Sequence, residues 1–263
     1  MTIHIQRRTS VSAAMIALIV GVAATSAIWA GDRDTNETES EDASELGGPV
    51  VPLKDARLKI ELNSTDQDVG IQAFIDADPW TTMAIFDPDG TLIFKSVTRG
   101  RFARQGGTEM FLESAEPNFA EVPLSEFLVR FPEGNYQIVG KGLKGEKLVG
   151  TAKFTHNMPA GPALVSPVDY THVNPNNTVV RWQHVAAPNG SPIVGYQVLV
   201  VKPNSGIPAI PKIILDVMMP ATATSMAVPP GFLLPDSEYE WEVLAIETSG
   251  NQTLSVGHFR TWR

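Results

Sequence analysis

Two pairs of aspartates are the part of this sequence best suited to binding a metal ion. Asp66 and Asp68 come between the first and second expected strands, whereas Asp87 and Asp89 come between the third and fourth. In an up-and-down order of strands, these two loops lie at the same end of a sheet, so the four carboxylates converge. Calcium takes six to eight oxygen ligands from flexible loops. The sequence therefore predicts a calcium site formed by these four side chains.

The aspartates also have a simpler interpretation. Aspartate initiates turns by bonding its own backbone, and Asp87-Pro88-Asp89-Gly90 is a tight hairpin signal. A turn explains this segment without any metal. Calcium is therefore the only cofactor that the sequence suggests, and the fold does not require it.

Trp80 is the second candidate for ligand binding. It follows Asp76-Ala77-Asp78-Pro79 at the start of an expected strand. The face of an exposed aromatic ring displaces water well from a pyranose, so Trp80 is a candidate platform for a sugar. The alternative is a tryptophan packed in the core.

Local signatures of enzymes are absent. The chain has no Gly-x-Ser-x-Gly elbow, no phosphate-binding glycine loop and no His-Glu-x-x-His zinc helix. It has no cysteine, which excludes disulfides, thiolate metal sites and cysteine nucleophiles. We therefore expect a protein without catalytic activity. An enzyme that takes carboxylates from distant strands leaves no local mark and stays open as a third class.

The candidate residues named above lie in or between short runs of alternating apolar residues, which predict strands. In residues 52–155 they are joined by one expected helix at 123–130, and a break with two prolines and a glycine follows at 156–162. The predicted parts are a signal peptide or anchor (1–30), an acidic disordered linker (31–50), a β-rich domain (51–157) and a second β domain (160–263).

The strand that begins at Tyr239 is the clearest element of the second domain. Tyr239 and Trp241 alternate with Glu240 and Glu242, so the aromatic residues are expected in the core and the glutamates in solvent. A tyrosine at the strand entrance suits a tyrosine corner, in which the hydroxyl bonds to upstream backbone.

Four separated features characterise residues 160–263. They are Trp182 in the second strand, Gly195-Tyr196 at the start of the third, the spacing of Leu233, Pro235 and Tyr239, and the turn at Gly250-Asn251. With these features the segment resembles a fibronectin type III domain. The resemblance implies a seven-stranded sandwich that acts as a spacer or binding platform without catalysis. The family's Arg-Gly-Asp loop is absent, so attachment to integrins is not expected.

The first thirty residues predict export. Arg7 and Arg8 precede an apolar run at 11–24, and a small-residue stretch at 27–30 offers a cleavage point. An uncleaved anchor is the alternative, because residues 11–30 are long enough to cross a bilayer. In both cases the rest of the chain is expected outside the cytoplasm, in the periplasm or secreted.

The net charge of the expected folded part limits the classes of partner that it can bind. Residues 31–48 hold seven acids and one arginine, and this composition predicts a disordered spacer. The spacer carries −6 and the leader +2, so residues 49–263 carry −5 of the total of −9. Mild acidity argues against nucleic acid and anionic lipid as partners. Membrane contact is expected only through an uncleaved leader.

The sequence thus predicts an all-β protein with two β-sandwich domains in tandem, the first with a short helical insertion. The expected function is a non-catalytic exported protein that presents its sandwiches to an envelope or extracellular protein. The alternative is an accessory module for calcium or polysaccharide, centred on the amino-terminal domain.

Overall fold

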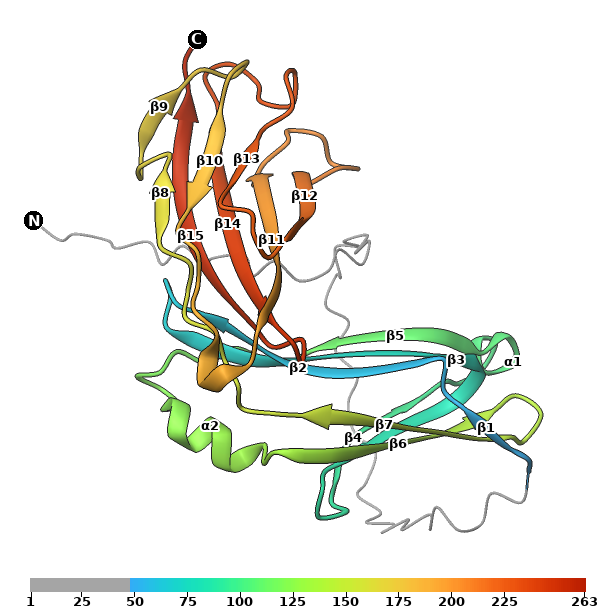
Figure 1. Ribbon diagram of the computed structural model, residues 1–263. Helices are drawn as coiled ribbons and strands as arrows, with labels where there is room; N and C mark the ends of the chain where they lie inside the picture. The colour runs from blue at the N-terminus through green and yellow to red at the C-terminus, as the bar shows by residue number, and fades with distance from the viewer. Residues whose placement is uncertain (1–47) are drawn as a thin grey trace, which may run out of the picture.

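The computed structural model describes residues 48–263, which form two β-sandwiches joined edge to edge (Figure 1). One hydrophobic core runs from Leu58 to Phe154 and a second from Val180 to Phe259. The predicted leader and nearly all of the acidic spacer lie outside the described residues. Within residues 48–263, no helix is both long and apolar enough to span a bilayer.

Seven strands and two short helices make up the amino-terminal half. They pair in the order β1-β7-β6-β3-β2, and β4 and β5 also pair with β3. The elements are β1 (Val50–Pro52), β2 (Asp55–Asn63), β3 (Asp68–Phe86), β4 (Leu92–Val97), α1 (Phe102–Gln105), β5 (Gly107–Glu113), α2 (Leu124–Arg130), β6 (Gly134–Gly142) and β7 (Lys147–Phe154).

Strand β3 contributes to both layers of this half. It runs for 19 residues, where the sequence predicted two separate strands. Its first part pairs with β2 and β5, and its second part pairs with β6 and β4. The register shifts on both sides of Trp80, so the buried positions Ala77, Trp80 and Met83 are three residues apart instead of two. Irregularities of this kind bend a strand and let it pass from one packed layer to the other.

Helix α2 closes one end of the amino-terminal core, where the sequence predicted a helix at 123–130. Pro123 comes immediately before it, a position at which the missing N–H of proline costs no helical hydrogen bond. Phe127 is buried, and Leu124, Leu128 and Phe131 pack against the same core. One apolar face therefore holds a helix of only seven residues in place.

Eight strands form the carboxyl-terminal half. One layer has the order β13-β10-β8, and the facing layer has the order β15-β14-β11-β12, with β9 beside β15. The strands are β8 (Leu164–Ser166), β9 (Thr171–Val173), β10 (Val179–Trp182), β11 (Ile193–Lys202), β12 (Ile213–Pro220), β13 (Ser225–Ala227), β14 (Glu238–Glu247) and β15 (Gln252–Thr261).

Aromatic side chains fill the space between these two layers. Trp182, Tyr196, Tyr239 and Trp241 are all buried, and the rings of Trp182 and Tyr196 lie 5.5 Å apart. Leu234 N donates a hydrogen bond to Tyr239 Oη at 2.8 Å, which closes the predicted tyrosine corner. The core positions predicted for Trp182 and Tyr239 are confirmed.

The two halves are joined by backbone pairing as well as by the connecting chain. Strand β15 runs parallel to β2, with Gln252 opposite Glu61 and Leu254 opposite Asn63. Ser64 N donates to Leu254 O at 2.9 Å and extends this ladder by one residue. One sheet therefore continues from the first half into the second, which the sequence did not predict.

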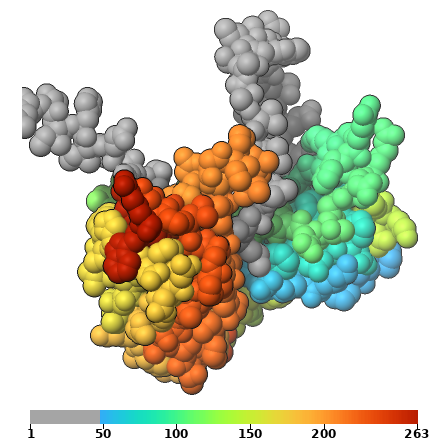
Figure 2. Space-filling view, turned by 90° about the horizontal axis from the view of Figure 1, so that it is seen from above, coloured from blue at the N-terminus to red at the C-terminus, as the bar shows by residue number. Residues whose placement is uncertain are grey.

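Asn251 fixes the geometry of this junction. Its Oδ1 accepts from Ile60 N at 2.8 Å, and its Nδ2 donates to Thr155 O at 2.8 Å and to Asn157 O at 3.1 Å. The side chain is buried, and a buried polar group left without its partner costs about 1–3 kcal/mol. Figure 2 shows the resulting shape, with the yellow-to-red half and the blue-to-green half as two separate masses.

Candidate functional site

The structure separates the two aspartate pairs that the sequence placed together. Asp66 lies just before β3 and Asp68 is its first residue, whereas Asp87 and Asp89 follow its last residue, Phe86. The pairs therefore lie at opposite ends of one strand, and the predicted convergence is wrong. The chain does not turn between Asp76 and Trp80, so the order of loops on which the prediction depended is absent.

One aspartate of each pair has a local structural role. Asp87 Oδ1 accepts from Asp89 N at 3.0 Å and from Thr91 N at 2.8 Å, as expected for a turn. Asp66 Oδ2 accepts from Asn63 Nδ2 at 2.9 Å. Burial, together with the negative charge of Asp66, raises the pKa of Asp68 to about 6.

Trp80 lies in the core rather than on the surface. Its side chain is 5% exposed and packs against Gly107, where an added Cβ would lie 2.7 Å from Trp80 Cζ2. No face of the ring is available for stacking on a sugar. The prediction of a sugar platform at Trp80 is therefore wrong.

Glu242, predicted to face solvent, is buried. The outward face of its sheet carries a small third apolar cluster that includes Leu199, Leu244 and Leu254. Burial raises the pKa of Glu242 well above its usual value, and the negative charges of Glu240 and Glu61 raise it further. In the part of the chain that the structure describes, Glu242 Oε2 has no hydrogen-bond partner.

Three glutamates lie together where the two halves meet, and we call them the junction carboxylate cluster: Glu61, Glu113 and Glu116. One carboxylate oxygen of each lies within 4.8 Å of the others. Glu61 is on β2 opposite Gly70 of β3, Glu113 ends β5, and Glu116 follows shortly after. A Cβ at Gly70 would lie 2.7 Å from Glu116 Cγ, so glycine allows Glu116 to cross the strand.

Burial controls the electrostatics of this cluster. It raises the pKa of Glu61 to about 7, although a hydrogen bond from Gln252 and the positive charge of Lys59 oppose the shift. Burial also raises the pKa of Glu113. Gln252 Nε2 donates to Glu61 Oε2, and Lys59 Nζ donates to Gln252 Oε1 at 2.9 Å. Gln252 therefore connects the cluster to the carboxyl-terminal half.

A cleft of about 710 Å³, which we call the junction cleft, lies beside the cluster in the angle between the two halves. Gln72 and Gln252 line the cleft and also contact the cluster. Strands β2, β3, β5 and β7 line it from the amino-terminal half, and β11, β12, β14 and the start of β15 line it from the carboxyl-terminal half. The lining includes Arg57, Lys59, Phe74, Phe111, Asp216 and Met218.

The polar groups of the junction cleft are partly paired. The guanidinium of Arg57 lies 4.5 Å from the centre of the Phe74 ring, and its Nε contacts Asp55 Oδ2 at 2.9 Å. Gln197 Nε2 donates to both carboxylate oxygens of Asp216, at 2.9 and 3.0 Å. The cleft thus combines apolar side chains with charged groups held in defined positions.

Two open strand edges border the junction cleft. Among the described residues, β5 pairs only with β3, and β12 pairs only with β11. The loop before β12 projects from the carboxyl-terminal half (Figures 1 and 2). An edge strand presents unpaired N–H and C=O groups with which another chain can pair.

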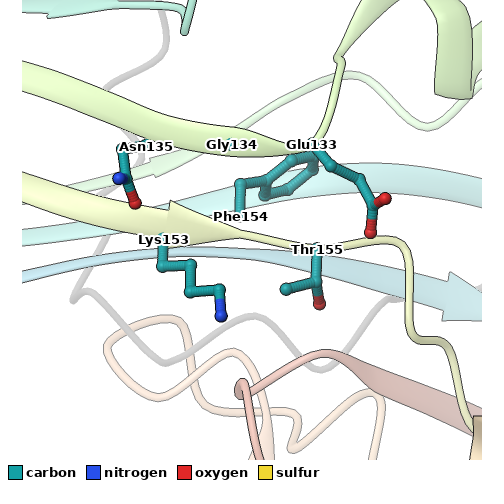
Figure 3. Close-up of a pocket in the computed structure, with 6 residues that line it drawn as sticks. All are labelled: Glu133, Gly134, Asn135, Lys153, Phe154 and Thr155. Carbon is teal, nitrogen blue, oxygen red and sulfur yellow. The ribbon is translucent and has the colours of Figure 1, made fainter.

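A second hollow, of about 410 Å³, lies at the turn between α2 and β6 and along β7. Figure 3 shows Lys153 and Thr155 on one side of β7 and Phe154 on the other. Phe154 belongs to the core, and Glu133 Oε1 already accepts a hydrogen bond from His156 N. This hollow therefore brings together no set of free polar groups.

The sequence did not indicate the junction residues. Glu61 and Lys59 lie on β2 between buried apolar residues, a pattern that predicts side chains in solvent. Only the pairing of β2 with β15, almost two hundred positions away in the chain, brings Gln252 onto them. Asn251 follows a turn glycine, and nothing in the nearby sequence indicates that its side-chain amide is buried.

Comparison with known proteins identifies one part of the chain. Residues 164–259 match the family model described as "Fibronectin type III domain". No curated protein matches this chain.

Several solved structures resemble the chain at low sequence identity. The chicken CNTN1 FN1-FN3 domains share 14% identity, with 82% of this chain and 69% of that chain covered and a TM-score of 0.33. Domains A168-A170 from titin share 15%, with 79% and 65% covered and a TM-score of 0.26. A tetra-tandem repeat in the extending region of a large adhesion protein shares 14%, with 79% and 49% covered and a TM-score of 0.26. The chain thus spans less than two thirds of the last two structures.

Proposed function

Because the carboxyl-terminal half is a fibronectin type III domain, we propose that this protein is a non-catalytic interaction module that binds another protein in the junction cleft. We further propose that residues 51–157 and 160–263 are its two domains, since each contains its own hydrophobic core. The leader in the sequence supports a position at the cell envelope or outside the cell.

The observation that carries this proposal is a cleft between two halves in fixed orientation. Its volume of about 710 Å³ is that of a pocket for a drug-sized molecule, about 300–1,000 Å³, so it has room for side chains of a partner. The hydrogen bonds of Asn251 hold the two walls, so no ordering of the domains is needed when a partner binds. Preorganisation of this kind lowers the free-energy cost of association.

An extended polypeptide segment is the partner that fits these walls. The open edges of β5 and β12 offer backbone hydrogen bonds, and Phe74, Phe111 and Met218 offer apolar contacts for alternate side chains. The polar groups are already engaged with each other in the pairs Arg57–Asp55 and Gln197–Asp216. In this function the paired groups orient the partner and take part in no catalytic step.

Charge substitution in the cleft tests this function. Met218 is 64% exposed and lines the cleft, so Met218→Asp should reduce capture of the partner from envelope extract at least tenfold, equivalent to about 1.4 kcal/mol. Val129 is 82% exposed on α2 and does not line the cleft, so Val129→Asp is the matched control. The measurement is quantitative mass spectrometry of proteins bound to the immobilised full chain.

Binding in the junction cleft requires one pattern of recovery. One protein must be recovered with the wild type and with Val129→Asp and lost with Met218→Asp. Equal recovery with both variants would place the interaction elsewhere on the surface. Enrichment of glycan without any protein would favour the alternative function, polysaccharide binding, for which Trp80 no longer provides a site.

A further inference from the structure

The junction carboxylate cluster has the dimensions of a calcium site. Calcium binds oxygen at about 2.3–2.6 Å, so two ligands of one ion lie at most about 4.6–5.2 Å apart. One oxygen from each of Glu61, Glu113 and Glu116 lies within 4.8 Å of the others. The spacing of the three oxygens therefore stays within the limit that one Ca²⁺ ion sets for any two of its ligands.

Glu61 indicates a ligand independently of this spacing. Its side chain is 1% exposed, and among residues 48–263 its Oε1 has no hydrogen-bond partner. A buried carboxylate oxygen without a partner is costly, and such atoms in native proteins call for an explanation such as a bound ion. A cation between the three glutamates would supply the missing interaction.

The surroundings of the cluster hold its members in position. Gln72 Nε2 donates to Glu113 Oε1 at 3.3 Å, and Gln252 Nε2 donates to Glu61 Oε2. Gly70 leaves the space that Glu116 occupies, since a Cβ there would lie 2.7 Å from Glu116 Cγ. Hydrogen bonds to the second oxygen of a ligand orient it toward the metal, which raises metal affinity.

We propose that Glu61, Glu113 and Glu116 bind one Ca²⁺ ion where the two halves meet. Ligands that are all oxygen select a hard cation, and water with the remaining carboxylate oxygens can complete six to eight ligands. Lys59 acts through Gln252: its ammonium donates to Gln252 Oε1 and so orients the amide that contacts Glu61. This site is distinct from the aspartate pairs and goes beyond the proposed function.

Calorimetric titration of the full chain with CaCl₂ tests the site. The expected result is one ion per chain, with a Kd of about 10⁻⁴–10⁻³ M, the range of extracellular modules. Glu61→Gln and Glu113→Gln keep the size of the side chain but remove one charge each, so each should weaken binding at least tenfold. Glu109→Gln is the matched control, because Glu109 is an exposed glutamate on the same strand as Glu113.

Two further measurements keep the result interpretable. Far-UV circular dichroism shows whether each variant is folded, and Tm should rise with calcium in the wild type and in Glu109→Gln but not in Glu61→Gln or Glu113→Gln. Asp89→Asn should bind calcium like the wild type, since Asp89 lies at the far end of β3. Absence of bound calcium at about 10 mM, tenfold above the weakest expected Kd, would overturn the proposal. Unchanged affinity in both folded glutamate variants would do the same.

Discussion

Glu61 shows how the environment of one residue depends on distant parts of the chain. It occupies an outward position of β2, where a glutamate would normally be solvated and ionised. Pairing with β15 buries it instead, beneath Gln252 and beside Glu116, and burial raises its pKa to about 7. Burial thus favours the neutral form of Glu61, whereas the proposed cation binds its charged form.

The stability of Glu61→Gln should depend less on pH than that of the wild type. The pKa of Glu61 is about 7 in the folded state and about 4.5 in the unfolded state, so between these values the folded state binds more protons. Wild-type stability should therefore fall as pH rises from 4.5 to 7, by about 3 kcal/mol from this group. Urea unfolding at several pH values, in EDTA, measures the difference. Parallel pH profiles for the two proteins would contradict the assigned pKa.

Residues with local partners were predictable, and residues with distant partners were not. Tyr239 lies five positions from Leu234, its hydrogen-bond partner, so the sequence alone identified the corner. Trp182 follows the alternation of its own strand. For Trp80 the sequence left a surface and a core position open, and Glu242 was misplaced, because bends and neighbouring strands from elsewhere in the chain decide what covers them.

Strand β3 is the element on which the amino-terminal sandwich depends. Asp76-Ala77-Asp78-Pro79 has the composition of a turn, which is why the sequence predicted two strands here. In the structure this segment is an irregularity within one strand, a place where proline is tolerated in a sheet. Most of the other strands and helix α2 were predictable because each shows a regular apolar pattern, whereas the three-residue strands β1 and β9 were not predicted.

Trp80→Ala should destabilise the protein by about 3–5 kcal/mol, the usual cost of removing a large buried aromatic side chain. Trp80 fills the bend of β3 against Gly107, so its loss leaves a cavity where the two layers meet. Trp262→Ala is the matched control, because Trp262 is 53% exposed and its loss should cost about 0.5 kcal/mol or less. Urea denaturation of both variants gives the comparison. A small loss for Trp80→Ala would show that the side chain is not part of the core.

The whole molecule is defined by the pairing of its two halves. Sequence patterns showed two β regions and the break at 156–162, but a parallel pairing between β2 and β15 has no local signal. The same pairing creates the junction cleft and buries the junction carboxylate cluster. Both proposals therefore depend on the halves forming one unit in solution.

Asn251→Ala tests this dependence, because it removes the side chain that bonds Ile60 N, Thr155 O and Asn157 O. It should lower the free energy of unfolding by about 2–4 kcal/mol, since several buried polar groups lose their partners. It should also reduce capture of the partner, although Asn251 does not line the cleft. Full capture by the destabilised variant would show that the fixed orientation is unnecessary.

Native-state hydrogen exchange at the junction amides tests the central claim most directly. Ile60, Ser64 and Val256 each donate their N–H across the junction, to Asn251 Oδ1, Leu254 O and Thr65 Oγ1. If the two halves form one unit, these amides exchange as slowly as Leu234 N, which bonds within a single half. If the three junction amides exchange at the rate of an unstructured peptide while Leu234 stays protected, the halves move independently and the account is wrong.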